Sequence, residues 1–189
     1  MIILASASPR RKDLLKKIGL KFKVDPSEFS ENLREDLSPE ELVKCNSTGK
    51  AKLAASKHPG AIIIAADTLG VIDDRIIGKP HSPEEAVNIL QNLSGKTHRV
   101  ITGLTVIDTV SKKILSRTVE TYVLIKNLTP QEIQNYVRSG EPLDKAGAYA
   151  IQGLGAMIVE KITGDFYNVV GLPLSVLVDC LRELGVSLL

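Results

Sequence analysis

The chain has no tryptophan, and aromatic residues make up only 4% of its 189 residues. Aromatic side chains are the platforms on which unpaired nucleic-acid bases stack, so a surface for single strands is not expected. The formal net charge of +2 is also small. A general nucleic-acid surface needs a clear basic excess, so the sequence predicts no nucleic-acid partner.

Cysteines and long apolar runs are scarce as well. The two cysteines, Cys45 and Cys180, form no CxxC pair, which favours a reduced, cytoplasmic compartment. Asp67 and Asp179 interrupt the best candidates for a membrane-spanning run. The N-terminus lacks the charged region and apolar core of a signal peptide. We therefore expect a cytoplasmic protein with no membrane contact.

Several common site patterns are missing. The three histidines have no metal-ligand spacing, and no Cys–His or Ser–His pattern indicates a covalent nucleophile. Gly49-Lys50 is not a P-loop, because Lys44 stands where the first glycine of that motif would be. A hard divalent cation, Mg²⁺ or Mn²⁺, held by carboxylates and substrate phosphates fits this composition better.

The first part of the chain predicts an anion site. Residues 2–5 are apolar and predict a short buried strand, and Ser8-Pro9 predicts the start of a helix. Arg10 and Arg11 lie in its first turn, where the helix dipole is already positive. Backbone N–H groups and two guanidinium groups there could hold a phosphate. A basic surface helix is the competing interpretation.

Strands and helices alternate along the rest of the chain. Ser38, Ser82 and Thr129 each begin a capping box with Pro at the first helical position, which predicts three helices. Further expected elements are a strand at 61–66, an antiparallel pair at 98–110 and 114–125, a strand at 156–162 and a helix at 173–184. We expect one α/β domain over residues 1–189, with a mixed twisted sheet flanked by helices and two lobes around a cleft.

Two places along the chain could carry chemistry. Asp67 follows the apolar run 61–66, and a carboxylate at the end of a buried strand must be paired, bound to a metal or exposed. An Asp capping the following turn is the alternative. Residues 140–155 gather glycines and small residues around Asp144, Lys145 and Gln152, which suggests backbone close to a ligand. A glycine-rich connection is the alternative there.

Seven motifs are spread over nearly the whole chain. In order, they are Ser6-Ala7-Ser8-Pro9-Arg10-Arg11, Lys50-Ala51, Ala65-Ala66-Asp67-Thr68, Gly78-Lys79-Pro80, Ser94-Gly95-Lys96-Thr97-His98-Arg99-Val100, the segment 140–155 and Asn168-Val169-Val170-Gly171-Leu172-Pro173-Leu174. Together they resemble the Maf family of nucleoside triphosphate pyrophosphatases. The resemblance implies a fold like that of inosine triphosphate pyrophosphatases. It also implies hydrolysis between the α- and β-phosphates of a nucleoside triphosphate with a divalent cation. A homodimer is plausible on the same ground.

The string Asp-Lys-Ala-Gly-Ala-Tyr-Ala-Ile-Gln-Gly at 144–153 resembles the branch of the family that acts on dTTP and UTP. The resemblance implies a catalytic set of Asp67, Lys50 and Lys79, and substrate contacts by Ser6, Arg10, Arg11, Thr68 and Gln152. Asp67 would be the proton acceptor or a metal ligand. The second metal ligand would be Glu31, with Glu28 as the alternative.

The sequence also departs from the family pattern. Residues 45–49 replace the usual apolar and basic residues before Lys50 and weaken the expected helix, and Gly70 replaces a β-branched residue. Two other functions stay open. One is a nucleotide-binding regulatory protein linked to septum formation, with little turnover. The other is the sister branch that acts on 7-methyl-GTP.

Overall fold

The computed structural model describes residues 1–30 and 36–188. Its strands are β1 (Ile2–Leu4), β2 (Lys23–Val24), β3 (Ile62–Ile72), β4 (Arg75–Ile77), β5 (Thr97–Asp108), β6 (Ile114–Ile125) and β7 (Val159–Thr163). Its α-helices are α1 (Pro9–Lys17), α2 (Pro39–Lys57), α3 (Pro83–Leu93), α4 (Pro130–Arg138), α5 (Phe166–Val170) and α6 (Leu174–Glu183). Three 3₁₀ turns lie between α4 and β7: η1 (Glu141–Asp144), η2 (Ala146–Ala148) and η3 (Gly153–Met157). This is the expected mixture of α and β elements.

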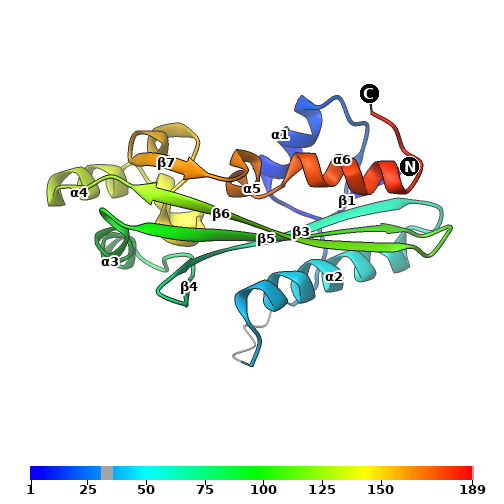
Figure 1. Ribbon diagram of the computed structural model, residues 1–189, viewed down its shortest axis with the longest axis horizontal. Coiled ribbons are helices and arrows are strands. Elements are labelled where there is room, and N and C mark those ends of the chain that lie inside the picture. The colour runs from blue at the N-terminus through cyan, green and yellow to red at the C-terminus, as the bar shows by residue number, and fades with distance from the viewer. Residues whose placement is uncertain (31–35, 189) are drawn as a thin grey trace. The chain divides into compact units, whose positions relative to one another are not determined.

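The strands form one mixed sheet in the order β2-β1-β3-β5-β6-β7, with β4 pairing to β3 (Figure 1). Strand β1 is parallel to β2 and β3, whereas β3–β4 and β6–β7 are antiparallel pairs. The neighbours β5 and β6 are joined by the short loop 109–113, and such a loop connects only antiparallel strands. The mixed sheet that the sequence predicts is therefore confirmed.

The chain divides into two compact units. The first comprises 1–67, 102–119 and 171–189, and the second comprises 68–101 and 120–170. Each unit has its own hydrophobic core. In the first, small and β-branched side chains such as Ile3, Ala54 and Ile63 pack together, and in the second Leu90, Val123 and Ile133 do so. Two lobes are confirmed.

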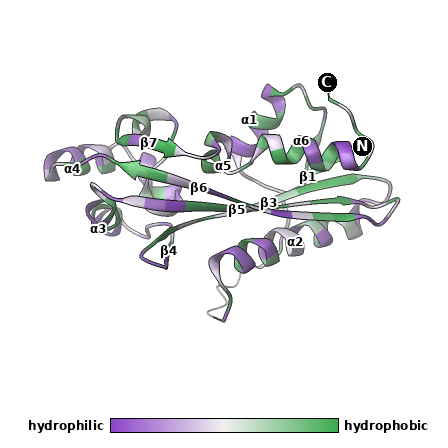
Figure 2. Cartoon of the chain, in the orientation of Figure 1, coloured by the Kyte–Doolittle hydropathy of each residue, from purple (hydrophilic) through white to green (hydrophobic). Residues whose placement is uncertain are grey.

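Helices of the first unit lie on both faces of its part of the sheet. Helix α2 lies on one face, and α1 and α6 lie on the other (Figure 1). Green hydrophobic and purple hydrophilic stretches alternate along α2 and α6, as expected for helices that cover a sheet on one side only (Figure 2). In the second unit α3 and α4 pack against each other.

Several expected boundaries were wrong. Strand β3 continues to Ile72 and does not end at residue 66. Residues 153–157 form a 3₁₀ turn, so β7 starts at Val159, and α5 was not expected. Helix α2 runs without a break through Gly49, although this stretch was expected to weaken it.

The three capping motifs differ in detail. Those at Ser38 and Thr129 form complete capping boxes. At α3, the hydroxyl of Ser82 accepts from the Glu85 N–H, but the Glu85 carboxylate accepts from His81 N–H instead of Ser82 N–H. All three motifs therefore start helices as predicted, but at α3 the Glu85 carboxylate bonds to the residue before the N-cap. Among the described residues no helix is long and apolar enough to cross a membrane.

Candidate active site

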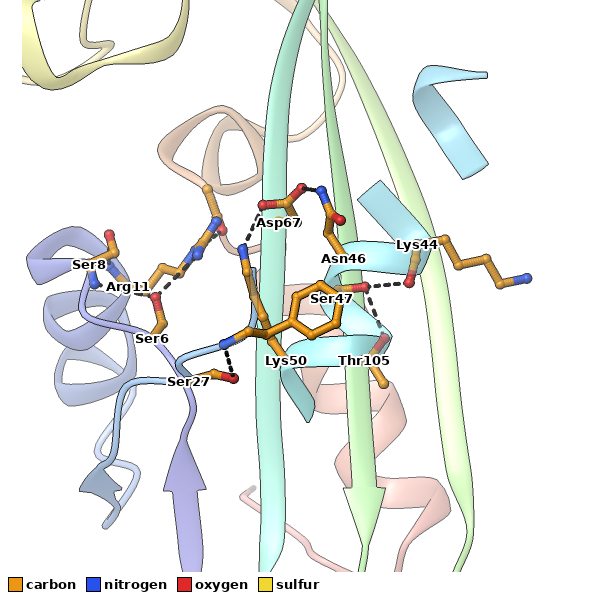
Figure 3. A network of polar contacts seen from close by, with 12 residues as sticks. Ser6, Ser8, Arg11, Ser27, Lys44, Asn46, Ser47, Lys50, Asp67 and Thr105 are labelled. Carbon is orange, nitrogen blue, oxygen red and sulfur yellow. Dashed lines mark hydrogen bonds and ion pairs between the residues drawn. The ribbon is translucent and has the colours of Figure 1, made fainter. Parts of the chain in front are cut away.

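Asp67 is a buried carboxylate in the middle of a strand. Asp67 is only 5% exposed, and β3 extends on both sides of it. Oδ1 lies 2.7 Å from Nζ of Lys50, and Oδ2 accepts a 3.0 Å hydrogen bond from Nδ2 of Asn46 (Figure 3). A buried charge is tolerated only when it is paired and hydrogen-bonded, and Asp67 meets both conditions. Asp67 was expected at the end of its strand, and this was wrong; because β3 continues past it, the alternative role of capping the following turn is excluded as well.

Helix α2 carries both partners of Asp67. Asn46 and Lys50 are separated by one helical turn, so their side chains leave the same face of the helix. That face continues with Ala51 and Ala54, which pack in the core of the first unit. Because these small apolar residues let α2 pack closely in the core, the side chains of Asn46 and Lys50 reach Asp67 on β3. Asn46 is 5% exposed and Lys50 is 8% exposed.

A second polar network joins α2 to the neighbouring strands. The hydroxyl of Thr105 on β5 lies 3.0 Å from that of Ser47 on α2 (Figure 3). It also lies 3.2 Å from the hydroxyl of Thr48 on the same helix. It also lies 3.1 Å from the hydroxyl of Ser116 on β6. Asn46, Ser47 and Thr48 therefore have polar partners outside the helix, which is consistent with a helix that is not interrupted there.

The predicted anion-binding residues lie in the loop between β1 and α1, which holds Ser6, and in the first turn of α1, which holds Arg10 and Arg11. The hydroxyl of Ser8 accepts from the N–H of Arg11, which caps the helix as expected. The guanidinium of Arg11 donates to the Ser6 hydroxyl at 3.1 Å and to the Gly171 carbonyl at 2.8 Å (Figure 3). Arg11 therefore holds the β1–α1 loop in place and also supplies a positive charge there. Arg10 is half-buried beside it in the chain.

The remaining predicted site residues lie in the second unit. Thr68 directly follows Asp67 on β3 and is half-buried, whereas Lys79 and Gln152 are exposed. Lys79 lies in the turn after β4, and Gln152 precedes η3. The N–H of Gly147 donates to the carbonyl of Gly78 at 3.1 Å, so the turn that carries Lys79 is bonded to the glycine-rich segment.

Comparison with known proteins decides the family. The profile of the Maf-like protein family matches residues 1–184. The chain belongs to the Maf family. The Maf motifs recognised in the sequence occupy seven places: the β1–α1 loop with the first turn of α1, helix α2, strand β3, the turn after β4, the α3–β5 turn with the start of β5, the segment from Gly140 to η3, and the stretch from α5 to α6.

Relatives named "dTTP/UTP pyrophosphatase" match this Maf chain over nearly its whole length. The protein of Methanococcoides burtonii is 50% identical over 99% of this chain and 96% of its own length. The proteins of Methanosarcina mazei and Dictyoglomus thermophilum are each 50% identical, over 98% and 100% of this chain and 95% and 98% of their own lengths.

The structure of the Staphylococcus aureus Ham1 protein aligns with a TM-score of 0.47 and 16% identity, over 84% of this chain and 79% of that chain. That score is too low to establish a shared fold, so the likeness to inosine triphosphate pyrophosphatases stays a prediction.

Asp67 is a carboxylate that fits a divalent cation in this Maf chain. Mg²⁺ is commonly held by one or two carboxylates together with substrate phosphates, and Asp67 supplies one. Glu31, the expected second ligand, lies outside the described residues. Its alternative, Glu28, is exposed, and its Oε2 lies 3.4 Å from Nζ of Lys57. Within residues 1–30 and 36–188, no group of three or more His, Cys, Asp or Glu side chains is placed to hold a metal ion.

Sequence reasoning missed Asn46 as a neighbour of Asp67. It treated the polar run 45–49 only as a weakness of the helix. The signal was the spacing of Asn46 and Lys50, since two polar residues one turn apart on an otherwise apolar face indicate a shared buried partner. Lys50 and Asp67, which belong to the same predicted catalytic set, lie 2.7 Å apart, and their catalytic roles stay a prediction.

Proposed function

We propose that this chain hydrolyses dTTP and UTP to the nucleoside monophosphate and pyrophosphate. The observation that carries the proposal is the identity of about half its residues to relatives that bear the name dTTP/UTP pyrophosphatase. The alignments extend over at least 98% of this chain in these three cases. A buried, fully paired carboxylate with a lysine beside it supports a catalytic centre rather than a binding surface alone.

The reaction requires water to attack the α-phosphorus. A new P–O bond forms, the bond from the α-phosphorus to the bridging oxygen breaks, and pyrophosphate leaves with that oxygen. One proton of the water is released as the bond forms. In our proposal the carboxylate of Asp67 either accepts this proton or holds the cation beside which water attacks.

Positive groups offset the charge that develops on the leaving pyrophosphate. We assign this role to Lys50 and Lys79. Lys50 is already 2.7 Å from Asp67, so the same ammonium orients the carboxylate and lowers the local negative charge. Ser6, Arg10 and Arg11 are assigned to the phosphate chain, because backbone N–H groups at the start of α1 and the guanidinium groups favour an anion there.

We further propose that a divalent cation, Mg²⁺ or Mn²⁺, takes part. Asp67 would hold it with oxygen atoms of the substrate, and Glu31 is proposed as the second carboxylate. When bound, such an ion polarises the phosphate oxygens and neutralises part of their charge. EDTA should abolish hydrolysis and added Mg²⁺ should restore it, and full activity in EDTA would exclude the cation.

A nucleotide panel tests the proposed substrates. The purified chain is incubated with UTP, dTTP, CTP and 7-methyl-GTP in the presence of inorganic pyrophosphatase, and the released phosphate is measured with malachite green. A site that leaves buried polar groups unpaired with the wrong base discriminates by about tenfold or more. We therefore expect UTP and dTTP to be cleaved at least about tenfold faster than CTP.

Other outcomes of the panel identify the competing functions. A preference for 7-methyl-GTP would place the chain in the sister branch. Binding of nucleotides without any phosphate release would favour a regulatory protein. We assign recognition of the base to Gln152, because its amide offers a donor and an acceptor to the O4 and N3–H edge of uracil or thymine. Equal rates on UTP and CTP would refute this assignment.

A further inference from the structure

Glu141 holds the segment that carries Gln152. Its Oε1 accepts hydrogen bonds from the N–H of Gly155 at 2.8 Å and from the hydroxyl of Tyr136 at 2.8 Å. Its Oε2 accepts from the N–H of Leu154 at 3.0 Å. These donors come from α4 and from the segment that leads to β7, both in the second unit (Figure 1). One carboxylate therefore joins a helix to the residues that directly follow Gln152.

Tyr136 completes the hold on the other side of Gln152. Its hydroxyl donates to Glu141 and accepts a 3.1 Å hydrogen bond from the N–H of Ala150. The backbone is thus fixed two residues before Gln152 by Tyr136, and two and three residues after it by Glu141. Together the two side chains form a clamp, which we call the Tyr136–Glu141 clamp.

Two glycines let the segment close around the clamp. Gly153 has a positive φ of 71°, and a Cβ there would lie 2.4 Å from Oε2 of Glu141. A Cβ on Gly155 would lie 2.0 Å from the carbonyl oxygen of Ala150 and 2.6 Å from the hydroxyl of Tyr136. Neither position has room for a side chain, so the glycines on both sides of Leu154 are required by the clamp itself.

The charge of Glu141 suits this role. Burial alone would raise the pKa of its carboxyl, but hydrogen bonds from Gly155, Tyr136 and Leu154 more than offset this and lower the pKa. Burial raises the pKa of the Tyr136 hydroxyl, which therefore stays a neutral donor. Near neutral pH the clamp is thus an ionised acceptor surrounded by donors, the stronger kind of hydrogen bond.

We propose that Tyr136 and Glu141 are positioning residues that set the base selectivity of the enzyme by fixing the backbone around Gln152. The inference rests on the proposed function, in which Gln152 reads the base. Gln152 is exposed and has extended backbone angles of φ −106° and ψ 163°. An exposed glutamine on a loose loop would lose more conformational freedom on binding the base, whereas a fixed backbone presents its amide from a constant place.

A double-mutant cycle tests the proposal. Glu141→Gln and Tyr136→Phe are each made in the unmodified chain and in a Gln152→Ala background, and kcat/KM is measured for UTP and CTP. Glu141→Gln turns part of the acceptor into a donor that faces N–H groups. We expect each clamp variant to lower the UTP-to-CTP ratio by about fivefold to tenfold in the unmodified chain. In the Gln152→Ala background the same substitutions should leave the ratio unchanged.

Asp108→Asn is the matched control. The Asp108 carboxylate also accepts two backbone N–H bonds and one hydroxyl bond, from Val110 and Ser111 in the β5–β6 loop of the first unit. This variant should leave the UTP-to-CTP ratio unaltered. Thermal melts of all variants identify any that are unfolded, and Tyr136→Phe, which removes a single hydroxyl, carries the test if Glu141→Gln fails to fold.

The outcomes distinguish this inference from the proposed function on which it rests. An unmodified chain without UTP preference would refute the proposed function. If Gln152→Ala lowers the UTP-to-CTP ratio but neither clamp variant does, the proposed function stands and a role of the clamp in base selectivity is excluded. If the clamp variants change the ratio equally in both backgrounds, they act independently of Gln152 and the positioning role is overturned.

Discussion

The ammonium nitrogen of Lys50 lies 2.7 Å from Oδ1 of Asp67, and both side chains are buried. The pair joins the face of α2 to the middle of β3 within the first unit. Removing one member of a buried ion pair destabilises a protein more than replacing both, because the remaining charge keeps its desolvation cost. Catalysis, in contrast, needs the carboxylate itself, so stability and activity can be separated at this pair.

Replacement of Asp67 tests that separation. Asp67→Asn should lower turnover by about 10²-fold or more and also destabilise the chain by roughly 3–5 kcal/mol, since Lys50 then faces a neutral amide. The double variant Asp67→Asn/Lys50→Met should recover most of the stability and none of the activity. Urea denaturation and UTP hydrolysis measured on the same samples check both. Near-normal turnover in either variant would remove Asp67 from the mechanism.

Asn46 is expected to support Asp67 through its amide. Asn46→Ala removes the donor to Oδ2 and leaves a buried carboxylate oxygen without that bond, a loss of about 1–3 kcal/mol. We expect kcat on UTP to fall by about tenfold with little change in KM. The control is Asn92→Ala on α3, which removes an exposed contact between Asn92 and Lys96. Equal kinetics for Asn46→Ala and Asn92→Ala would show that Asp67 does not need Asn46.

The backbone of α2 lies close to β5 at Gly103. A Cβ at Gly103 would lie 2.3 Å from the carbonyl oxygen of Val43, which is backbone and cannot move aside without shifting the helix. Gly103→Ala should therefore cost about 1–3 kcal/mol or more. At Gly70 the nearest atoms would be at 3.7 Å, so Gly70→Ala should be neutral or stabilise by up to about 1 kcal/mol. The melting temperature should fall in Gly103→Ala and stay unchanged or rise in Gly70→Ala, and a similar fall in both would contradict the packing described here.

His98 gives stability a dependence on pH. It is 2% exposed, its Nε2 lies 2.9 Å from the Tyr149 hydroxyl, and burial lowers its pKa to about 4, opposed by the Val123 carbonyl. Above pH 6.5 the ring is neutral in both the folded and the unfolded chain, so its contribution is fully present there. As pH falls from 6.5 towards 4, only the unfolded chain takes up the proton, and stability should decrease by up to about 3 kcal/mol.

Titration of the His98 ring by NMR checks this directly. The expected result is an imidazole that stays neutral to about pH 4, together with weaker resistance to urea at pH 5 than at pH 7. His98→Gln should remove this part of the pH dependence. An ordinary midpoint near 6.5 for the ring in the folded chain would contradict its buried, neutral state.

Local signals in the sequence predicted the helix starts well. Ser38 and Thr129 form the reciprocal bonds that their motifs require, because a capping box depends only on residues within one turn. Strand ends were harder. Apolar residues mark where β3 begins, but Asp67 and Thr68 interrupt that pattern. The strand continues through Asp67, whose carboxylate is satisfied by Asn46 and Lys50 of α2.

The sequence predicts which residues form the site but not the contacts that they make. Lys50 and Asp67 are recognisable from their motifs, whereas the amide of Asn46 and the carboxylate of Glu141 act through bonds to residues distant in sequence. Such bonds follow from how α2 packs on β3 and how η3 folds back on α4, and neither arrangement is encoded in a local pattern. Polar residues on an otherwise buried face are the sign that would have revealed them.

Identification of the reaction products tests the central claim most directly. UTP is incubated with the purified chain and Mg²⁺, without added pyrophosphatase, and the products are followed by ³¹P NMR. We predict equal amounts of UMP and pyrophosphate, with Asp67→Asn giving neither at a comparable rate. Formation of UDP and inorganic phosphate, or no hydrolysis of UTP at all, would contradict the account.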